Sequence, residues 1–572
     1  MNRNYLFYLL CCFVLVSCTT QPQTAVKELK ISRVENMPNQ PQPYKMLDWH
    51  EKAVNFDEAI FDFDATGEFR PFIWLDSAKR NLPQATFGLY TVIGDVRQGP
   101  DQNNGEFHEA INSLGALMSA GLVGIDKRDQ KGYNYVKMIQ NYFNTSNGWN
   151  IMMNNTCPEV ALLGGGYGRD WWYDVFPNVL FYAVSELHPD VDGAEAIQKT
   201  IAEQFFKADS ILNGNYDYSY FDYAQMKGMR NNIPYQQDAA AGHAYVLYSA
   251  YQKFGDPRYL EGAKSATEAL LSQKESRFYE VLIPFGAYVA ARLNAEHGTN
   301  YDISKIIDWT FDGCTAKAGR TGWGIISDRW GEYDVHGLQG SITHDGGYGF
   351  LMNTFDMAWP LIPMVRYDQR YARAMGKWIL NAANASRLCY PYEIPDANQY
   401  LPGDKSITRN VIAYEGLKKV DAYNTEKFKG VSPIALGDGP NWVVSQPKLS
   451  MFSIYGSAHA GIFGSIIKKT NVEKILQLNC LATDFYRAKA YPTYLYFNPY
   501  NSAKEVEFNN EGSAVDLYDA ISGTVMARNV EHKGSFSIKP DKACLIVVIP
   551  TGSKLNRSNG KVMANGVVIS YF

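Results

Sequence analysis

Residues 238–272 read DAAAGHAYVLYSAYQKFGDPRYLEGAKSATEALLS, and this stretch decides the fold. On both sides of Gly255-Asp256-Pro257, apolar residues recur every three or four positions, which is the spacing of a helix with one buried face. Glycine, aspartate and proline in succession end one helix and begin another. The stretch therefore predicts a helical hairpin.

The same pattern recurs along residues 105–386. The hairpins follow one another at irregular intervals of roughly 40 to 60 residues without a shared consensus, which disfavours a regular solenoid and favours a closed ring. A sixth pair is expected around residues 451–467, with a partner before residue 107 or near residue 414. The expected helices are 107–122, 135–143, 172–187, 193–212, 238–254, 259–272, 280–295, 303–311, 350–365 and 370–385.

After residue 491 the apolar spacing changes to the alternation of short β-strands. The sequence thus predicts a mainly α chain, an (α/α)6 toroid of helical hairpins over residues 47–490 with a C-terminal antiparallel β-sandwich domain over residues 491–572. The expected strands are 494–497, 506–508, 515–518, 524–526, 536–538 and 545–549.

The first residues have the features of a bacterial lipoprotein signal. Residues 1–17 contain Arg3 followed by a short apolar run, which is typical of a signal peptide. Leu15, Ser17 and Cys18 match a lipobox, so we expect cleavage before Cys18 and lipid attachment to its thiol. Residues 18–46, rich in Gln and Pro, are expected to form a flexible tether. We expect a protein anchored in the cell envelope, on either face of the outer membrane, with the lipid as its only membrane contact.

The composition excludes some partners and favours others. A net charge of −5, a pI near 6.0 and the absence of a Lys/Arg run give no basic surface for nucleic acid. An aromatic content of 14%, with 39 Tyr and 11 Trp, suits sugar rings, which stack on aromatic faces. The cysteines outside the export signal lack metal or redox spacing, so we expect small buried residues and no metal or cofactor. These cysteines are Cys157, Cys314, Cys389, Cys480 and Cys544.

The first candidate for a functional site is GGGYGRDWWYD at residues 164–174. Arg169, the carboxylates Asp170 and Asp174, and the rings of Trp171 and Trp172 form a set suited to holding a sugar. Alternatively, Asp170 caps the following helix. The glycines do not form a phosphate loop, because no Gly-Lys-Ser/Thr follows them.

The second candidate is DRWGEYDVHGLQGSITHDGGY at residues 328–348. An irregular stretch of this length between hairpins is more often functional than a simple connection, although turn and capping roles remain the alternative. Its two histidines lack an HExxH spacing, so a metal site is disfavoured. The candidates are Glu332, Asp334 and Asp345 for catalysis and His336, Gln339, His344 and Tyr348 for substrate binding.

A third, looser group starts a helix at Gln236, Gln237, Asp238 and His243, and another acid, Glu415, stands between Tyr414 and Gly416. Asp238 at a helix start either caps the helix or binds substrate.

Four stretches carry a family resemblance. The lipoprotein start, YDVHGLQGSITHDGGYGFLMNTF at 333–355, and the strands TYLYFNPY at 493–500 and VDLYD at 515–519 resemble the six-hairpin carbohydrate-active enzymes of Bacteroides and relatives. Within that group the chain resembles glycoside hydrolase family 154 from about residue 71 onward. The resemblance implies an (α/α)6 toroid and β-glucuronidase activity, and it assigns no catalytic residue.

A glycoside hydrolase needs one carboxylic acid and one carboxylate around the scissile bond. We expect these from Asp170, Asp174, Glu332, Asp334 and Asp345, and we expect Arg169 to bind the carboxylate of a uronic acid because its planar fork matches that group.

Two other functions remain open. A polysaccharide lyase would use His336, His344 or Tyr348 as its base, and its product would absorb in the ultraviolet. A non-catalytic glycan-binding lipoprotein would bind glycans without turnover.

Overall fold

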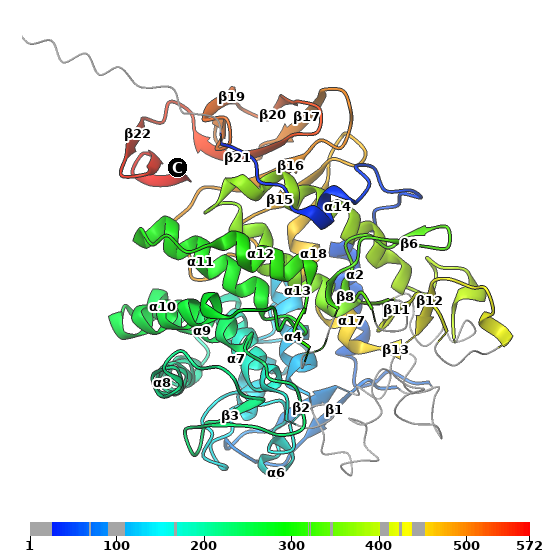
Figure 1. Ribbon diagram of the computed structural model, residues 1–572, viewed down its shortest axis with the longest axis vertical. Coiled ribbons are helices and arrows are strands. Elements are labelled where there is room, and N and C mark those ends of the chain that lie inside the picture. Colours follow the sequence, from blue (N-terminus) through cyan, green and yellow to red (C-terminus); the bar gives the residue numbers. More distant parts are fainter. Residues whose placement is uncertain are drawn as a thin grey trace, which may run out of the picture.

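The computed structural model describes residues 26–67, 70–89, 109–164, 169–317, 320, 322–343, 347–400, 411–421, 426–436 and 452–572. A large helical body occupies most of the molecule, and a β-domain lies against one end of it (Figure 1). This arrangement confirms the predicted combination of a helical toroid with a β-domain.

The inner layer of the helical body is a closed ring. Each inner helix contacts the next, and α17 and α18 contact α4 to complete the circle. The members are α4 (Ala110–Leu122), α7 (Trp171–Leu187), α9 (Ala239–Phe254), α11 (Ile283–His297), α13 (Leu351–Met364), α17 (Ile454–Ala458) and α18 (Gly461–Ile466).

Other helices pack around this ring. The predicted helix 135–143 is in fact a short α-helix followed by a 3-10 turn. The helix expected somewhere before residue 107 is α2, which contacts α17 and α18. The outer elements are α2 (Trp49–Ile60), α5 (Tyr135–Met138) with η3 (Ile139–Tyr142), α8 (Ala194–Leu212), α10 (Pro257–Ser272), α12 (Ile303–Asp312) and α14 (Ala372–Ser386). The predicted helices are therefore confirmed to within a few residues at each end.

The junction of α9 and α10 shows why the chain reverses where it does. Gly255 ends α9 with a φ of 70°, a left-handed conformation that glycine adopts without a Cβ clash. The side chain of Asp256 then accepts a hydrogen bond from the backbone N–H of Arg258, and Pro257 occupies the first turn of α10. The quoted stretch thus forms the hairpin that its sequence predicts.

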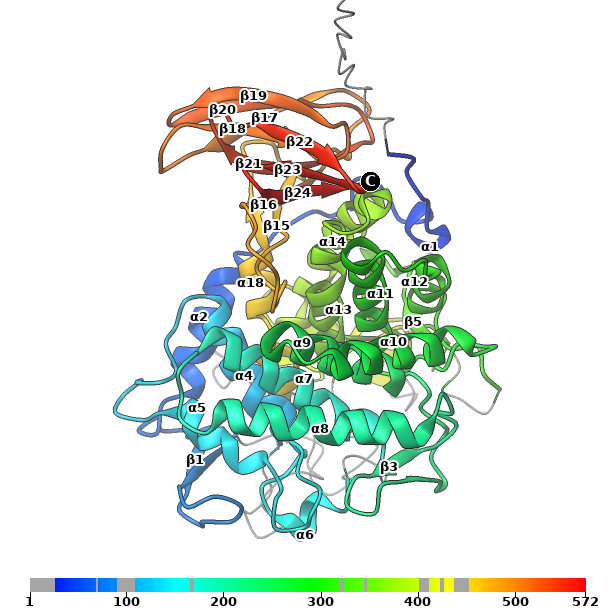
Figure 2. The same ribbon diagram turned by 90° about the vertical axis from the view of Figure 1, so that its left-hand side faces the viewer.

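Because outer helices return the chain between inner ones, the inner helices all run in the same direction. Their N-termini therefore gather at one end of the ring, which we call the site end, and their C-termini gather at the other. Figure 2 shows the inner helices α9, α11 and α13 below the β-domain. A five-stranded antiparallel sheet lies at the site end, where β9 leads directly into α13. Its order is β12 (Ile434–Leu436), β11 (Gly416–Lys418), β9 (Tyr348–Phe350), β8 (Gln339–Ser341) and β5 (Trp323–Ile325).

Short two-stranded pairs complete the helical body. These are β1 (Ile73–Asp76) with β2 (Thr86–Leu89), β3 (Tyr220–Asp222) with β4 (Lys227–Met229), β6 (Arg329–Trp330) with β7 (Tyr333–Asp334), and β10 (Ala413–Tyr414) with β13 (Phe452–Ser453).

The C-terminal domain contains all of the predicted strands. Its main sheet has the order β14 (Ile467–Lys469), β15 (Leu476–Asn479), β16 (Thr493–Phe497), β21 (Ala543–Pro550), β18 (Val515–Asp519) and β19 (Thr524–Val530). The two-stranded antiparallel sheet of β17 (Lys504–Asn509) and β20 (Lys533–Ile538) shares a second hydrophobic core with this sheet. A three-stranded sheet of β22 (Leu555–Ser558), β23 (Lys561–Ala564) and β24 (Val567–Tyr571) follows. Strands β14 and β15 precede residue 491, so the main sheet starts earlier than the predicted boundary.

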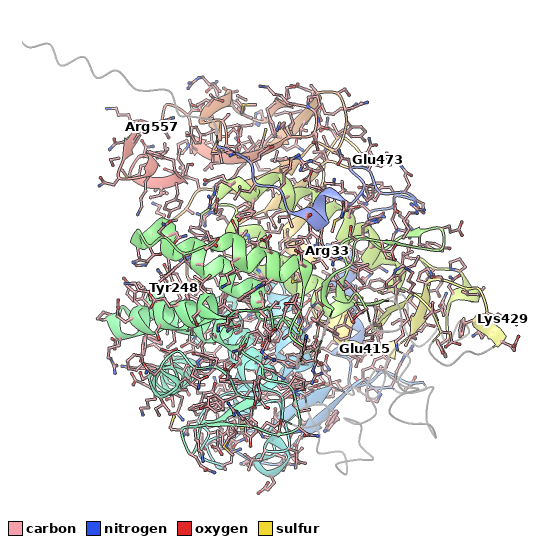
Figure 3. All side chains as sticks on the ribbon, in the orientation of Figure 1. Arg33, Tyr248, Glu415, Lys429, Glu473 and Arg557 are labelled. Atoms are coloured by element: carbon pink, nitrogen blue, oxygen red, sulfur yellow. The ribbon has the colours of Figure 1, made fainter. Side chains whose placement is uncertain are left out.

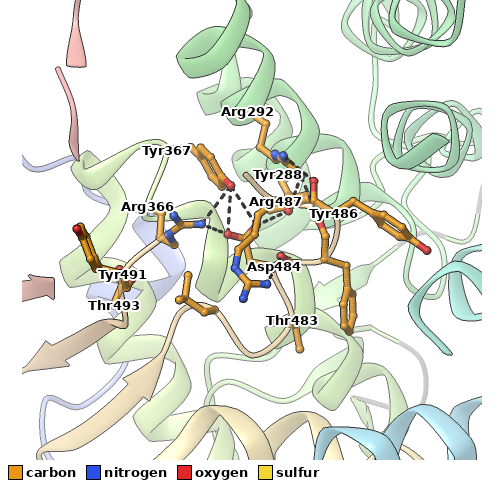
Figure 4. A network of polar contacts seen from close by, with 12 residues as sticks. Tyr288, Arg292, Arg366, Tyr367, Thr483, Asp484, Tyr486, Arg487, Tyr491 and Thr493 are labelled. Atoms are coloured by element: carbon orange, nitrogen blue, oxygen red, sulfur yellow. Dashed lines mark hydrogen bonds and ion pairs between the residues drawn. The ribbon is translucent and has the colours of Figure 1, made fainter. Parts of the chain in front are cut away.

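Residues 480–487, between β15 and β16, cover the C-terminal end of the ring, which we call the capped end. Asp484 is fully buried there and accepts hydrogen bonds from the hydroxyls of Tyr288 at 2.5 Å and Tyr367 at 3.1 Å (Figure 4). Arg366 forms an ion pair with the same carboxylate, and Arg292 donates to the backbone carbonyl of Phe485 at 3.3 Å. The two domains are therefore joined by a saturated polar network.

The expected flexible tether is wrong for its second half. Residues 28–45, which we call the strap, lie along α14, where Ile31, Val34 and Met37 are buried. Prolines cannot donate backbone hydrogen bonds, but their carbonyls still accept them. Asn381 donates to the carbonyl of Pro38 at 3.0 Å, and Asn384 of α14 and Arg387, directly after it, donate to the carbonyl of Pro43. The composition suggested flexibility, whereas the partner helix supplies the missing contacts.

Two further features concern the described residues alone. None of their helices is both long and apolar enough to cross a membrane. The five predicted buried cysteines are buried and carry free thiols.

Candidate functional site

Three buried carboxyl groups meet at the site end of the ring. Asp170 precedes α7, Asp238 precedes α9, and Glu280 lies three residues before α11. Their exposed fractions are 2%, 0% and 6%. Residues far apart in the sequence share this end because every inner helix begins there. The partial positive charge of helix N-termini favours negative groups at this position.

Asp170 is the member of the cluster that forms an ion pair. The Nη2 of Arg320 lies 3.0 Å from its Oδ1 and 3.1 Å from its Oδ2. The side-chain amide of Gln236 also donates to Oδ1, while its carbonyl accepts from the backbone N–H of Trp172 at 3.0 Å. Asp170 stands at the N-cap position of α7 but makes no capping hydrogen bond. Its carboxylate is therefore directed to Arg320 rather than to its own helix.

Glu280 has the properties of a proton donor. Burial raises its pKa from 4.5 to about 7, and the nearby charge of Asp170 acts in the same direction. The amide of Asn353 donates to its Oε2 at 2.6 Å. Glu280 also has a φ of 57°, which is uncommon for a residue with a side chain. Backbone strain of this kind concentrates at functional sites.

Asp238 is the most deeply buried of the three acids. Burial raises its pKa from 3.8 to about 8, and the charges of Asp170 and Glu280 raise it further. Its Oδ2 accepts a hydrogen bond from the backbone N–H of Tyr279 at 3.2 Å, and no helix-capping bond is formed. At neutral pH Asp238 is protonated and fixes the segment that carries Glu280.

Several buried polar atoms around Glu280 have no hydrogen-bond partner among the described residues. Gln339 donates from Nε2 to the backbone carbonyl of Glu280 at 2.9 Å, yet its Oε1 is unsatisfied. Buried polar groups in folded proteins are nearly always paired, so an unpaired set suits water or ligand hydroxyls. The set comprises Asp238 Oδ1, Gln339 Oε1, Asn353 Oδ1 and Trp172 Nε1.

Arg169 and Asp174 bind each other instead of facing this cluster. Arg169 Nη2 lies 2.7 Å from Asp174 Oδ1, and its Nη1 donates to the carbonyl of Ala161 at 3.0 Å. The guanidinium also lies over the ring of Trp149 at 4.1 Å. Burial raises the pKa of Asp174 to about 6. Arg169 therefore has its fork filled by Asp174, which argues against its expected role as the uronate ligand.

The neighbouring tryptophans and His243 belong to the packed interior. Trp171 is fully buried and stacks on Tyr216 with ring centroids 5.5 Å apart. Trp172 is 2% exposed and lies 4.0 Å from the ring of Tyr173. Burial lowers the pKa of His243 to about 3, so it is neutral. The indole N–H groups of Trp171 and Trp172 have no hydrogen-bond partner among the described residues.

The first half of the 328–348 stretch lies away from the carboxyl cluster. Glu332 is exposed at the turn between β6 and β7. Asp334 pairs with Arg329 and accepts a hydrogen bond from the backbone of Gln42 in the strap. His336 lies 3.7 Å from Asp334, and burial lowers its pKa. Asp334 holds the strap, with His336 beside it and Glu332 exposed, and no contact joins these residues to the acids at the site end among the described residues.

The second half of the stretch reaches the site end. Gln339 on β8 contacts Glu280 as described, and Tyr348 lies on the adjacent strand β9. His344 and Asp345 lie outside the described residues. Glu415 is 4% exposed, and its backbone carbonyl accepts from the N–H of Leu351 at the start of α13 (Figure 3). The stretch thus combines a structural half with a half that supports the site.

Sequence reasoning missed Glu280, Asn353 and Arg320. Glu280 was taken as the first residue of a helix, and Arg320 stands in a glycine-containing connection without a motif. The available signal was topological: in a ring of hairpins every second helix begins at the same end. Grouping the acids at those helix starts joins Asp170, Asp238 and Glu280.

Among the described residues, no group of three or more His, Cys, Asp and Glu side chains could hold a metal ion.

No protein-family model matches this chain, and no curated protein is similar to it. Among solved structures, a GH127 beta-L-arabinofuranosidase from Geobacillus stearothermophilus T6 is 10% identical, covering 92% of this chain and 85% of its own with a TM-score of 0.34. Another GH127 beta-arabinofuranosidase is 11% identical, covering 91% and 78% with a TM-score of 0.34. A structure described as a glycoside hydrolase is 11% identical, covering 80% and 76% with the same TM-score of 0.34. Likeness at this level carries no argument about activity, so the function is inferred from the site itself.

Proposed function

We propose that this protein is an exported glycoside hydrolase that cleaves a uronic acid-containing glycan, with a β-glucuronidase-like activity and an (α/α)6 catalytic ring. The observation that carries the proposal is the contrast between two neighbouring carboxyl groups. Glu280 has a pKa raised to about 7, while Asp170 is bound as a carboxylate by Arg320. Two carboxyl groups held in opposite protonation states are what acid–base glycoside cleavage requires.

In this proposal, protonated Glu280 donates its proton to the glycosidic oxygen as the bond to the anomeric carbon breaks. The leaving sugar departs as a neutral alcohol, and Glu280 becomes a carboxylate. The carboxylate of Asp170 stabilises the developing positive charge, or accepts the proton of the attacking water. Asn353 Oδ1, which is unpaired among the described residues, can accept a hydrogen bond from a sugar hydroxyl, and protonated Asp238 can donate one from Oδ1.

Arg320 supports the choice of a uronic acid. Its side chain is 23% exposed, compared with 2% for that of Asp170. The guanidinium of Arg320 lies 3.7 Å from the centre of the Tyr279 ring. This contact keeps the guanidinium beside the carboxyl cluster. An arginine in this position can hold a substrate carboxylate while it remains near Asp170. We assign to Arg320 the role that the sequence suggested for Arg169.

The membrane anchor belongs to the same proposal. Lipid attached at Cys18 would tether the chain at the outer membrane, and the strap then leads from the β-domain, where Lys542 contacts Glu28 at 2.7 Å, along α14. We expect Cys18→Ala to release the protein from the membrane fraction. Continued membrane association of this variant would refute the anchor.

The activity is tested with oligosaccharides that end in a uronic acid, resolving products by chromatography and ultraviolet absorbance. Hydrolysis without new ultraviolet absorbance supports the proposal. A product that absorbs in the ultraviolet would identify a lyase instead, and binding without turnover across the panel would identify a glycan-binding protein. Arg320→Lys should raise KM for the uronic acid substrate, because lysine keeps the charge but loses the fork.

A further inference from the structure

A second cationic group lies beside the carboxyl cluster, on the ring of Tyr235. The guanidinium of Arg230 lies 4.9 Å from the centre of this ring, and that of Arg277 lies 5.5 Å from it. The two arginines come from different parts of the chain, Arg230 after β4 and Arg277 after α10. Two cations on one aromatic ring repel each other unless an anion lies between or beside them.

The local acids do not use all the donors of this pair. Glu275 lies 3.2 Å from Arg277 Nη2, but Arg277 Nη1 has no hydrogen-bond partner among the described residues. Arg230 donates from Nε to the backbone carbonyl of Asp217 at 3.2 Å. The carboxylate of Asp217 accepts a hydrogen bond from Gln237. Guanidinium donors therefore remain for an external anion.

The arginines are connected to the proposed catalytic acids. Arg277 donates from Nε to Gln237 Oε1 at 2.9 Å, and Gln237 directly precedes Asp238. Arg277 also stands three residues before Glu280. Three residues of backbone span at most about 10 Å, a distance that neighbouring sugar units of one chain can bridge.

We propose that Arg230, Tyr235 and Arg277 form a second subsite that binds the carboxylate of another uronic acid unit in the same glycan. Arg230 and Arg277 supply charge-assisted hydrogen bonds, and the exposed part of Tyr235 supplies an apolar surface for the sugar ring. This inference rests on the proposed function, because it places the second uronic acid next to the bond that Glu280 and Asp170 cleave.

The test compares the wild type with the double variant Arg230→Gln/Arg277→Gln. Binding is measured as the retardation of the protein in native gels that contain either polyglucuronic acid or neutral dextran. We expect roughly tenfold weaker binding of polyglucuronic acid by the variant, the usual scale for losing a charged hydrogen bond, and no change with dextran.

Arg258→Gln is the matched control. Arg258 also lies on aromatic rings, at 5.5 Å from Phe206, but it belongs to the start of α10 at the capped end. This variant should bind polyglucuronic acid like the wild type. If the double variant does not fold, Arg230→Gln alone, at an exposed position, replaces it.

Each outcome decides between the two proposals. Retained polyglucuronic acid binding by the folded variant overturns the subsite, whatever the enzyme cleaves. Weakened binding supports the subsite. If the wild type binds polyglucuronic acid through these arginines but cleaves no glycan, the subsite is supported and the proposed hydrolase activity is refuted.

Discussion

The two ends of the helical ring use the same kinds of residue in opposite ways. At the capped end, buried Asp484 has hydrogen bonds from Tyr288 and Tyr367 and an ion pair with Arg366. At the site end, buried Asp238 has one oxygen without a partner among the described residues, and Glu280 has a pKa raised to about 7. Both ends contain buried acids next to arginine and tyrosine.

The two ends differ in how completely the oxygens of their buried carboxyl groups are hydrogen-bonded. A buried carboxylate whose oxygens are all bound stabilises the packing around it, and removing it leaves partners unpaired. A buried carboxyl group with a spare oxygen costs stability, on the order of 1–3 kcal/mol. Burial alone therefore does not identify a functional acid, whereas burial with missing partners and a raised pKa makes a group at a cluster of acids a candidate.

The largest effect is expected for Glu280→Gln. The substitution keeps the shape and the contact with Asn353 but removes the proton, so turnover should fall by about 10² to 10⁴. The melting temperature should stay the same or rise. Glu332→Gln, at the exposed β6–β7 turn, is the matched control and should keep wild-type turnover. Equal loss in both variants would contradict the contrast between these two glutamates.

At the capped end, Asp484→Asn should act on stability rather than on chemistry. The buried guanidinium of Arg366 would lose its counter-charge, which typically costs about 3 kcal/mol. Denaturant unfolding should show this loss, while kcat per folded molecule remains unchanged. A large fall in kcat without destabilisation would mean that the capped end takes part in the reaction.

Asp238→Asn should change the pH dependence of stability. The pKa of an aspartate in an unfolded chain is about 3.8, and burial raises that of Asp238 to about 8 in the folded protein. Above pH 4 the unfolded chain loses this proton while the folded chain keeps it, so this contribution to stability falls as the pH rises toward 8. Asparagine does not titrate. Thermal unfolding should therefore show a gain of about 1 kcal/mol or more for the variant at pH 8 relative to pH 4. A gain independent of pH would argue against the raised pKa.

The smallest effect is expected for Asp334→Asn. This residue holds the strap through Gln42 and pairs with Arg329, whose side chain is 48% exposed. Solvent weakens such a pair, so the free energy of unfolding should fall by at most about 1 kcal/mol. Turnover should not change, measured on the same glycan as for Glu280→Gln. A slow but fully stable Asp334→Asn would restore the first half of the 328–348 stretch as part of the site.

The sequence predicted the helical hairpins well because their signals are local. Apolar spacing and breaks such as Gly255-Asp256-Pro257 determine where a helix ends without reference to the rest of the chain. Asp170, Asp238 and Gln339 were also found, since they stand at helix starts or in a long connection. These predictions needed only neighbouring residues.

The remaining residues depend on contacts between distant segments. Arg169 and Arg320 both stand in glycine-containing connections, and only the folded chain shows that Asp174 occupies the first while the second reaches Asp170. Asp334 was chosen for its acidic neighbourhood, but its partner is the strap, far away in the sequence. The strap forms one helical turn, α1 (Ser32–Glu35), and is otherwise held by hydrogen bonds to side chains of α14, so its own sequence has no extended apolar period.

The central claim is that Glu280 at the site end donates the proton to the leaving sugar. The most direct test compares Glu280→Gln on two glucuronides, one whose leaving group is a sugar alcohol and one whose leaving group is an acidic phenol. A sugar alcohol needs protonation to leave, whereas an acidic phenol does not. The account predicts a turnover loss of about 10² or more for the first substrate and a loss of less than about tenfold for the second. Equal losses on both substrates would contradict it.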